Sequence, residues 1–98
     1  MKKIISVFGA MPQFIKVKLL SEGLKKRRIN HLLVHTGQHY DYEMSKIFFD
    51  ELTIPLPRYN LNVGSHIPST QIAFIMEKLE KVFLKERPKI VITYGDTN

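Results

Sequence analysis

The stretch IISVFGAMPQFIK (residues 4–16) decides the fold class of this protein. Its first part, from Ile4 to Phe8, is apolar and rich in β-branched residues, which predicts a strand covered on both faces. Gly9 ends this run, and Pro12 is suited to the first turn of a helix, where its missing N–H costs nothing. The N–H groups at a helix N-terminus are unpaired and favour an anion. The stretch therefore predicts the first strand–helix unit of an α/β fold.

Three more apolar runs follow, and helical patterns separate them. The runs at residues 31–36 and 89–95 are nearly continuous like the first, so we expect these strands to be covered on both faces as well. The strand candidates are residues 4–9, 31–36, 59–63 and 89–95. The helix candidates are residues 12–27, 41–52 and 69–86. Because the connections are long enough for helices, this alternation predicts right-handed βαβ units in a parallel sheet. We expect an α/β, Rossmann-like parallel sheet with flanking helices, which binds ligands at the carboxyl ends of its strands.

The apolar residues of each helix candidate predict the face that it turns to the sheet. In the first helix they are Ile15, Leu19, Leu20 and Leu24. In the second helix they are Met44, Ile47, Phe48 and Leu52. In the third helix they are Ile72, Ile75, Met76, Leu79, Val82 and Phe83. We expect the methionine and phenylalanine side chains of the third helix to lie in the core and not to bind a cofactor.

Composition limits the class of protein. The 98 residues are 44% hydrophobic and 24% charged, which supports one globular core. The absence of cysteine excludes disulfides and thiolate metal sites, and no apolar run approaches the roughly 20 residues that span a bilayer. We expect a cytoplasmic protein that does not act at a membrane. The basic run KKRR (residues 25–28) is expected to complement the dipole at a helix C-terminus and not to bind nucleic acid, since no recognition motif accompanies it.

Polar residues follow three of the predicted strands at the expected ligand edge. Lys16, one turn into the first helix, is placed either to reach a phosphate or to stay solvated beside Lys18. Gln38 and His39 lie on the loop after the second strand, where an imidazole that changes charge is useful. Asp96 follows the fourth strand, where acid/base chemistry and an N-cap for a further helix are equally good interpretations.

The histidines at positions 31, 35 and 39 recur every four residues. The first two lie on a predicted strand, where a four-residue step spans about 13 Å. Such side chains cannot all ligate one ion at about 2 Å. We therefore predict no metal site.

Together these segments resemble the non-hydrolysing UDP-N-acetylglucosamine 2-epimerases. The resemblance rests on SVFGAMPQFIK (6–16), HTGQHYDYEMSKIFFDEL (35–52), YNLNVGS (59–65) and EKVFLKERPKIVITYGDTN (80–98). It covers nearly the whole chain but only the first part of a family member. It implies the N-terminal half-domain of a GT-B fold, in which two Rossmann-like domains face each other across a cleft. Residues 1–98 would then be part of the N-terminal domain, and the rest of that domain and the C-terminal UDP-binding domain would lie outside the chain.

Members of this family interconvert UDP-N-acetylglucosamine (UDP-GlcNAc) and UDP-N-acetylmannosamine (UDP-ManNAc). The proton on C2 is lost and UDP is eliminated, which leaves a 2-acetamidoglucal; UDP then adds back with the opposite configuration at C2. The resemblance implies that no cofactor is used, because the departing UDP is also the returning reagent. The product feeds polysaccharide biosynthesis.

The resemblance also implies roles for particular residues. Asp96 of YGDTN matches a carboxylate tied to the acid/base chemistry, and Lys16 of PQFIK matches a lysine near the active-site cleft. Gln38 and His39 of TGQH match a loop that helps bind a second, regulatory substrate molecule in bacterial relatives. Family members dimerise partly through helices of this domain, and the apolar pair at positions 48 and 49 would supply such a surface.

The clearest departure from the family lies in the first loop. The family loop typically reads GTRPE, whereas residues 9–13 read GAMPQ. Gly9 is kept, Met11 replaces an arginine and Gln13 replaces a glutamate, and these three join Lys16 as candidate substrate-binding residues. Loss of the arginine removes a permanent cation with five donors, which weakens diphosphate binding if the contact is buried.

Three functional hypotheses follow. The leading one is an N-terminal fragment of a UDP-GlcNAc 2-epimerase, an isomerase, which binds UDP-sugars in the full-length protein and is inactive alone because half of the cleft is absent. The second is a non-catalytic remnant that serves as an interaction or dimerisation module. The third is a free-standing nucleotide-binding domain.

Overall fold

The computed structural model describes residues 3–9, 11–37, 50, 57–64 and 66–94. These residues form four strands and two long helices, in the order β1, α1, β2, β3, α3, β4. The strands are β1 (Lys3–Phe8), β2 (Asn30–His35), β3 (Tyr59–Asn60) and β4 (Ile90–Thr93). The helices are α1 (Met11–Lys26) and α3 (Pro68–Glu86). The helix expected over residues 41–52, with its inward residues and the dimer surface at positions 48 and 49, lies outside the described residues apart from Asp50.

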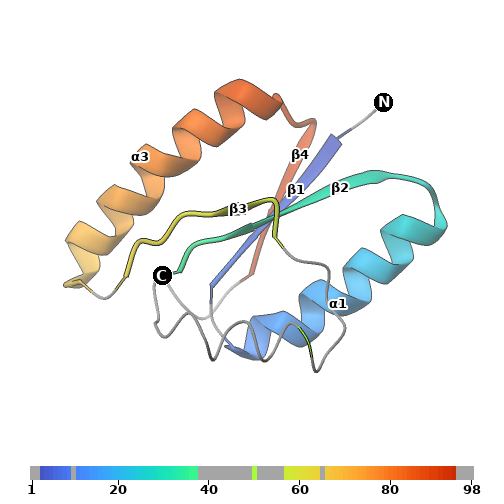
Figure 1. Cartoon of the computed structure of the whole chain (residues 1–98), viewed down its shortest axis with the longest axis horizontal. Coiled ribbons are helices and arrows are strands. Elements are labelled where there is room, and N and C mark those ends of the chain that lie inside the picture. Colours follow the sequence, from blue (N-terminus) through green and yellow to red (C-terminus); the bar gives the residue numbers. More distant parts are fainter. Residues whose placement is uncertain (1–2, 10, 38–49, 51–56, 65, 95–98) are drawn as a thin grey trace.

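The strands form one parallel sheet in the order β3-β2-β1-β4. β1 lies at its centre and pairs with β2 from Lys3↔Asn30 to Phe8↔His35, and with β4 along its other side. α1 covers one face of the sheet and α3 covers the other (Figure 1). All strands run the same way, so their carboxyl ends share one edge. The predicted α/β, Rossmann-like parallel sheet with flanking helices is confirmed.

The sheet divides the core into two clusters. The cluster on the α3 side consists of Ile5, Val7, Val34, Leu61, Val63, Ile75 and Val82. The cluster on the α1 side consists of Phe8, Phe14, Val17 and Leu33, with Tyr94 packed against it. Successive residues of β1 enter different clusters because side chains alternate across a strand.

The face that α1 turns to the sheet differs from the prediction. Phe14 is 2% exposed and Val17 is fully buried, whereas Ile15 is 56% and Leu19 is 65% exposed. Positions three apart share a helix face, and Phe14 also makes an edge-to-face contact with Phe8, at 5.4 Å between ring centroids. The prediction that Ile15 and Leu19 face the sheet is therefore wrong. The other two expected residues are half-buried: Leu20 and Leu24.

α3 begins and ends close to the predicted bounds. Its buried residues are Gln71, Ile75 and Val82, with Leu79 and Phe83 partly buried. Ile72 and Met76 are exposed, so the prediction that they lie in the core is wrong. Met76 lies beside Leu79 and Phe83 on α3, and no described element covers Ile72 or Met76.

β4 is an edge strand of the described sheet. Ile90 is 51% exposed and Val91 is 41% exposed, although they lie on opposite faces of the strand. The prediction that this strand is covered on both faces is therefore wrong for this chain, because α1 and α3 lie over β1 and β2 and no described strand pairs with the outer side of β4.

Candidate functional site

Both helices begin at the edge of the sheet where the strands end. α1 begins three residues after β1, and α3 begins after the extended segment that follows β3. The first turns of both helices lack acidic residues, and α3 has no side-chain cap at its N-terminus. A helix N-terminus carries partial positive charge on its unpaired N–H groups. This edge is therefore suited electrostatically to an anionic ligand.

Gln13 joins the loop after β1 to the end of β4. Its side chain is 5% exposed. The backbone N–H of Gly9 donates to Gln13 Oε1 at 2.9 Å, and Gln13 Nε2 donates to the carbonyl oxygen of Tyr94 at 3.2 Å. Since the first partner is a donor and the second an acceptor, the orientation of the amide is determined by its surroundings. Two of the candidate residues, Gly9 and Gln13, are thus brought together.

Tyr94 is held by its side chain as well. Its hydroxyl donates to Ser6 Oγ at 3.2 Å, and Ser6 Oγ lies 2.7 Å from Nε2 of His31. Ser6 is fully buried, and burial lowers the pKa of His31 below its ordinary value. A chain of polar side chains therefore runs from the end of β4 across β1 to β2 beneath α1. Its only signal in the sequence was a serine inside an apolar strand.

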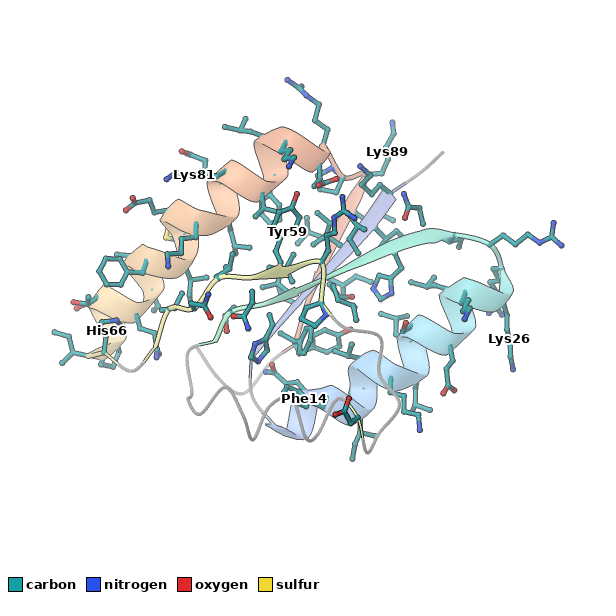
Figure 2. The ribbon with its side chains drawn as sticks, viewed as in Figure 1. Phe14, Lys26, Tyr59, His66, Lys81 and Lys89 are labelled. Carbon is teal, nitrogen blue, oxygen red and sulfur yellow. The ribbon has the colours of Figure 1, made fainter. Side chains whose placement is uncertain are left out.

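His35 lies at the carboxyl end of β2 in an aromatic environment. It is 2% exposed, and its ring centroid lies 5.3 Å from that of Phe8 and 5.8 Å from that of Phe14, which points from α1 toward the sheet (Figure 2). Burial lowers the pKa of His35 to about 4, and a hydrogen bond with Asn60 opposes this shift. His35 is therefore neutral at pH 7 and contributes packing beside the candidate site.

The backbone beyond β2 and β3 stays paired toward the ligand edge. Leu61 N–H donates to His35 O at 2.8 Å, Val63 N–H to Thr36 O at 3.0 Å, and Gly64 N–H to Gly37 O at 2.7 Å. The chain leaves β2 through Gly37, whose φ is 68°. A Cβ atom there would lie 2.9 Å from Asn60 Oδ1 and 3.0 Å from Asn62 Cα, so the position requires glycine.

The other candidates are less defined by the fold. Lys16 is exposed on α1, and Met11 begins that helix. Gln38, His39 and Asp96, and the side chain of Met11, lie outside the described residues. Among the residues that are described, no group of three or more possible ligands is placed to hold a metal ion.

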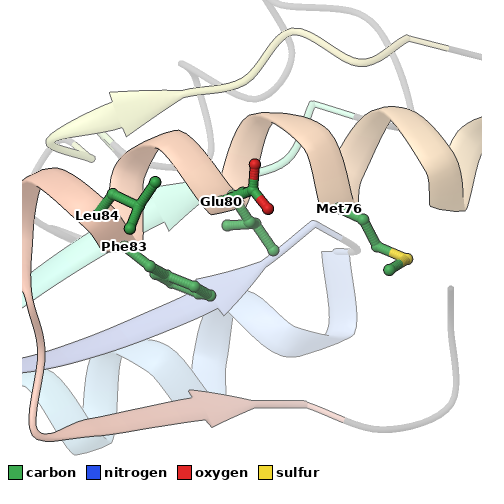
Figure 3. A pocket seen from close by; sticks show the side chains of 5 residues that line it. Met76, Glu80, Phe83 and Leu84 are labelled. Carbon is green, nitrogen blue, oxygen red and sulfur yellow. The ribbon is translucent and has the colours of Figure 1, made fainter.

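An apolar hollow lies elsewhere, along α3 (Figure 3). It is lined by Met76, Leu79, Glu80, Phe83 and Leu84. It begins two turns beyond the N-terminus of α3 and offers a single charged group, so it is not suited to a nucleotide. No helix in the described part of the chain is long and apolar enough to span a membrane.

Comparison with protein families identifies a matching family. The family model described as UDP-N-acetylglucosamine 2-epimerase matches residues 22–98. A UDP-N-acetylglucosamine 2-epimerase homolog of Methanococcus maripaludis is 51% identical over 98% of this chain and 27% of its own length. A UDP-2,3-diacetamido-2,3-dideoxy-D-glucuronate 2-epimerase of Pseudomonas aeruginosa is 41% identical over 98% of this chain and 27% of its own length.

Solved structures agree with this match. The crystal structure of the Methanocaldococcus jannaschii UDP-GlcNAc 2-epimerase, in complex with UDP-GlcNAc and UDP, superposes on 97% of this chain with a TM-score of 0.90 and 42% identity. The matched part is 26% of that chain. The chain thus spans about a quarter of the length of the relatives that it matches.

Proposed function

We propose a function from one established premise: this chain belongs to the UDP-N-acetylglucosamine 2-epimerase family. In our proposal it forms the first part of the N-terminal, Rossmann-like domain of an enzyme that interconverts UDP-GlcNAc and UDP-ManNAc. The rest of that domain and a second, UDP-binding domain complete the cleft. The 98 residues alone are inactive, because a two-domain cleft encloses its substrate from both sides.

One observation carries the proposal. The backbone superposes with a TM-score of 0.90 on an epimerase that holds UDP-GlcNAc and UDP, and the carboxyl edge of the sheet keeps the geometry that suits an anion. The reaction follows from the chemistry at C2 of the sugar. A base removes the C2 proton and UDP departs from C1 with the bonding electrons, which leaves the 2-acetamidoglucal. UDP then adds back at C1 while a proton is delivered to the opposite face of C2, and this inverts C2. The reaction needs no NAD and no metal.

We assign the following roles to the candidate residues. Asp96 is the acid/base carboxylate at C2, and Lys16 offers a cation to the diphosphate as its charge develops. Gly9 belongs to the loop that approaches the substrate. Gln38 and His39 bind a second, regulatory substrate molecule on the loop after β2.

Met11 weakens substrate binding in this proposal. It stands where the resemblance places an arginine, so the loop lacks a planar cation for the diphosphate. Met11→Arg is therefore expected to lower the KM for UDP-GlcNAc. An unchanged KM would show that this position does not contact the substrate.

The test uses the chain together with the coding sequence that follows Asn98 in its gene. Conversion of UDP-GlcNAc to UDP-ManNAc is measured, with trapping of the glucal and UDP. Asp96→Asn is expected to lower kcat by about 100-fold or more, as for the loss of a general acid/base, and Lys16→Met to raise KM. Lys26→Met is the matched control, because Lys26 is exposed in the last turn of the same helix. No conversion by the wild-type protein would contradict the proposal and favour the non-catalytic remnant.

A second substrate is tested in the same assay. The Pseudomonas aeruginosa relative, named for UDP-2,3-diacetamido-2,3-dideoxy-D-glucuronate, is nearly as similar to this chain as the Methanocaldococcus jannaschii enzyme. Both substrates carry a 2-acetamido group and UDP, so the same elimination at C2 serves both. A higher kcat/KM for the diacetamido glucuronate would reassign the substrate while keeping the mechanism. The proposal also includes a cytoplasmic location and a homodimer, with no part for nucleic acid.

A further inference from the structure

We infer that Gln13 is a positioning residue, whose side-chain amide sets the spacing between the loop after β1 and the end of β4. The contacts on which this rests are independent of any activity. Its consequence for turnover rests on the proposed function, because Tyr94 precedes the proposed acid/base residue Asp96 by two positions in the sequence.

The side-chain amide of Gln13 lies between two backbone groups at the end of the sheet, where pairing between β1 and β4 has stopped. The ladder between β1 and β4 ends at Val7↔Thr93, so Gly9 and Tyr94 lie just beyond it. Gln13 Oε1 and Nε2 reach these two residues at 2.9 and 3.2 Å. One side chain from the first turn of α1 thus continues the link between the two strands where their backbones cease to pair.

The link needs a donor and an acceptor on the same side chain. A carboxylate of the same length accepts from Gly9 but cannot donate to the Tyr94 carbonyl unless it is protonated. An apolar side chain of similar length bonds to neither backbone group, which leaves a buried N–H at Gly9 and a part-buried carbonyl at Tyr94 without this partner and is unfavourable. Glutamine is therefore suited to this position in this chain, where the family loop typically has a glutamate that would accept from Gly9 alone, and the N–H of Gly9 is already engaged by the protein.

Tyr94 is restrained from its side chain too, through its hydrogen bond to Ser6. We call the pair of hydrogen bonds that join Gln13 to Gly9 and Tyr94 the clamp. It acts on the backbone of Tyr94, whose side chain is held separately by Ser6. Loss of the amide contact is expected to shift the backbone at the end of β4 and of the loop, and not to release Tyr94 from the core. Small displacements of this kind lower turnover strongly when reacting groups must align.

The test compares Gln13→Met and Gln13→Glu with wild type in the full-length gene product. Backbone amide exchange is followed on peptides that contain Gly9, and kcat and KM are measured per folded molecule between pH 5 and pH 8. Of the described ionisable groups near Gln13, Tyr94 and His35 are the relevant ones. The pKa of His35 is about 4, so this range lies above its titration.

For Gln13→Met we expect exchange at Gly9 to rise about tenfold or more, and kcat to fall by about 10- to 100-fold with a smaller change in KM. For Gln13→Glu we expect Gly9 to stay protected. Its kcat relative to wild type should be highest at pH 5, where a protonated carboxyl can donate to Tyr94, and should fall toward pH 8. A role in stability alone would not produce this pH profile in the folded fraction.

The matched control is Gln71→Met. Gln71 is also a buried glutamine that donates to a backbone carbonyl, that of Gly64 at 3.3 Å, but it lies on α3. The Gln71→Met variant should be less stable than wild type, but amide exchange at Gly9 should not change. Unchanged exchange at Gly9 in Gln13→Met, or wild-type kcat in that variant, would overturn the inference. Faster exchange at Gly9 in a protein whose wild type does not epimerise UDP-sugars would support the clamp and contradict the proposed function.

Discussion

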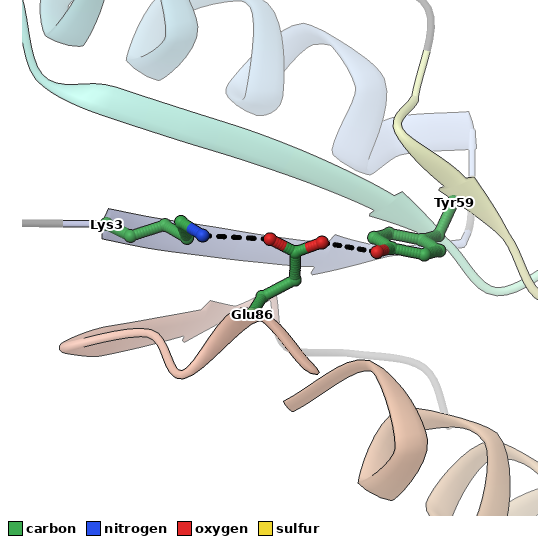
Figure 4. Close-up of polar contacts among 3 residues, drawn as sticks. All are labelled: Lys3, Tyr59 and Glu86. Atoms are coloured by element: carbon green, nitrogen blue, oxygen red, sulfur yellow. Dashed lines mark hydrogen bonds and ion pairs between the residues drawn. The ribbon is translucent and has the colours of Figure 1, made fainter. Parts of the chain in front are cut away.

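The ammonium group of Lys3 lies 2.8 Å from Oε1 of Glu86, so the first residue of β1 is joined to the last residue of α3 (Figure 4). The Tyr59 hydroxyl donates to the other carboxylate oxygen. One carboxylate therefore ties together the start of the central strand, the edge strand β3 and the C-terminus of a helix. Lys3 and Glu86 are far apart in the sequence, and their contact joins the C-terminal end of α3 to the sheet.

Glu86→Gln is expected to destabilise the fold at pH 7. The Lys3 hydrogen bond, followed by that of Tyr59, lowers the pKa of the Glu86 carboxyl. A depressed pKa means that the contribution to stability is present above the unfolded pKa of Glu and is lost as the pH falls through the lower, folded value. The difference in urea midpoint between wild type and variant should therefore shrink below about pH 4. Glu80→Gln, on the exposed side of the same helix, serves as control and should show no such change. An equal effect of both substitutions at pH 7 would contradict the role of Glu86.

His35 is expected to make stability depend on pH in a higher range. In the unfolded chain it takes up a proton near pH 6.5, whereas burial lowers its folded pKa to about 4. Its contribution is complete above pH 6.5 and falls as the pH approaches 4, by about 3 kcal/mol in all. Urea unfolding of wild type and His35→Phe at pH 7 and pH 5 measures this. The variant should lose less stability on acidification; equal losses would show that His35 is not the group that titrates.

Replacement by alanine is expected to change stability in opposite directions at two glycines. Gly37→Ala should destabilise by about 1–3 kcal/mol, because a positive φ is unfavourable for alanine and the new Cβ would meet Asn60 and the Asn62 backbone. Gly23→Ala should stabilise by about 0.5–1 kcal/mol, since it lies within α1 and its Cβ would come no closer than 3.6 Å to Arg27. Thermal unfolding of both variants checks the sign. A stabilising Gly37→Ala would mean that the segment leaving β2 takes another path.

The orientation of α1 can be tested by truncating neighbouring residues. Phe14→Ala should cost about 3–5 kcal/mol, because it removes a buried ring that packs on Phe8 and His35. Ile15→Ala should change stability by about 0.5 kcal/mol or less, since most of its side chain is exposed. Denaturant midpoints distinguish the two. The reverse order would restore the face predicted from the sequence.

The fold class was predictable because it depends on local patterns. The apolar run at residues 4–8, the helix-favouring Pro12 and the long amphipathic pattern of residues 69–86 each determine an element by themselves, and alternation of the elements then implies a parallel sheet. The inward face of α1 was predicted wrongly because two apolar stripes lie on that helix. The stripe that is buried is the one that packs against Phe8 of β1 and His35 of β2.

Some features of the candidate site were also predictable from the sequence, whereas others depended on the fold. Gly9 and Gln13 were named as candidates because residues 9–13 resemble the family loop, but the function of Gln13 as a bridge could not be predicted, because its partner Tyr94 lies 81 positions away. The chain of hydrogen bonds from Tyr94 through Ser6 to His31 likewise depends on the strand order, since it joins residues of β1 and β2 to the residue that follows β4. Gln38, His39 and Asp96 remain predictions from motif alone.

The sequence by itself determined the α/β class, the bounds of the two described helices to within one residue, and the absence of thiol chemistry. Hydrophobic spacing and proline act on neighbouring residues, and composition is a property of the sequence itself, so all three can be interpreted without knowledge of the fold. Only the tertiary structure decided which residues are buried, the neutrality of His35 and the clamp between Gly9 and Tyr94. These depend on desolvation and on contacts between residues that the sheet order brings together.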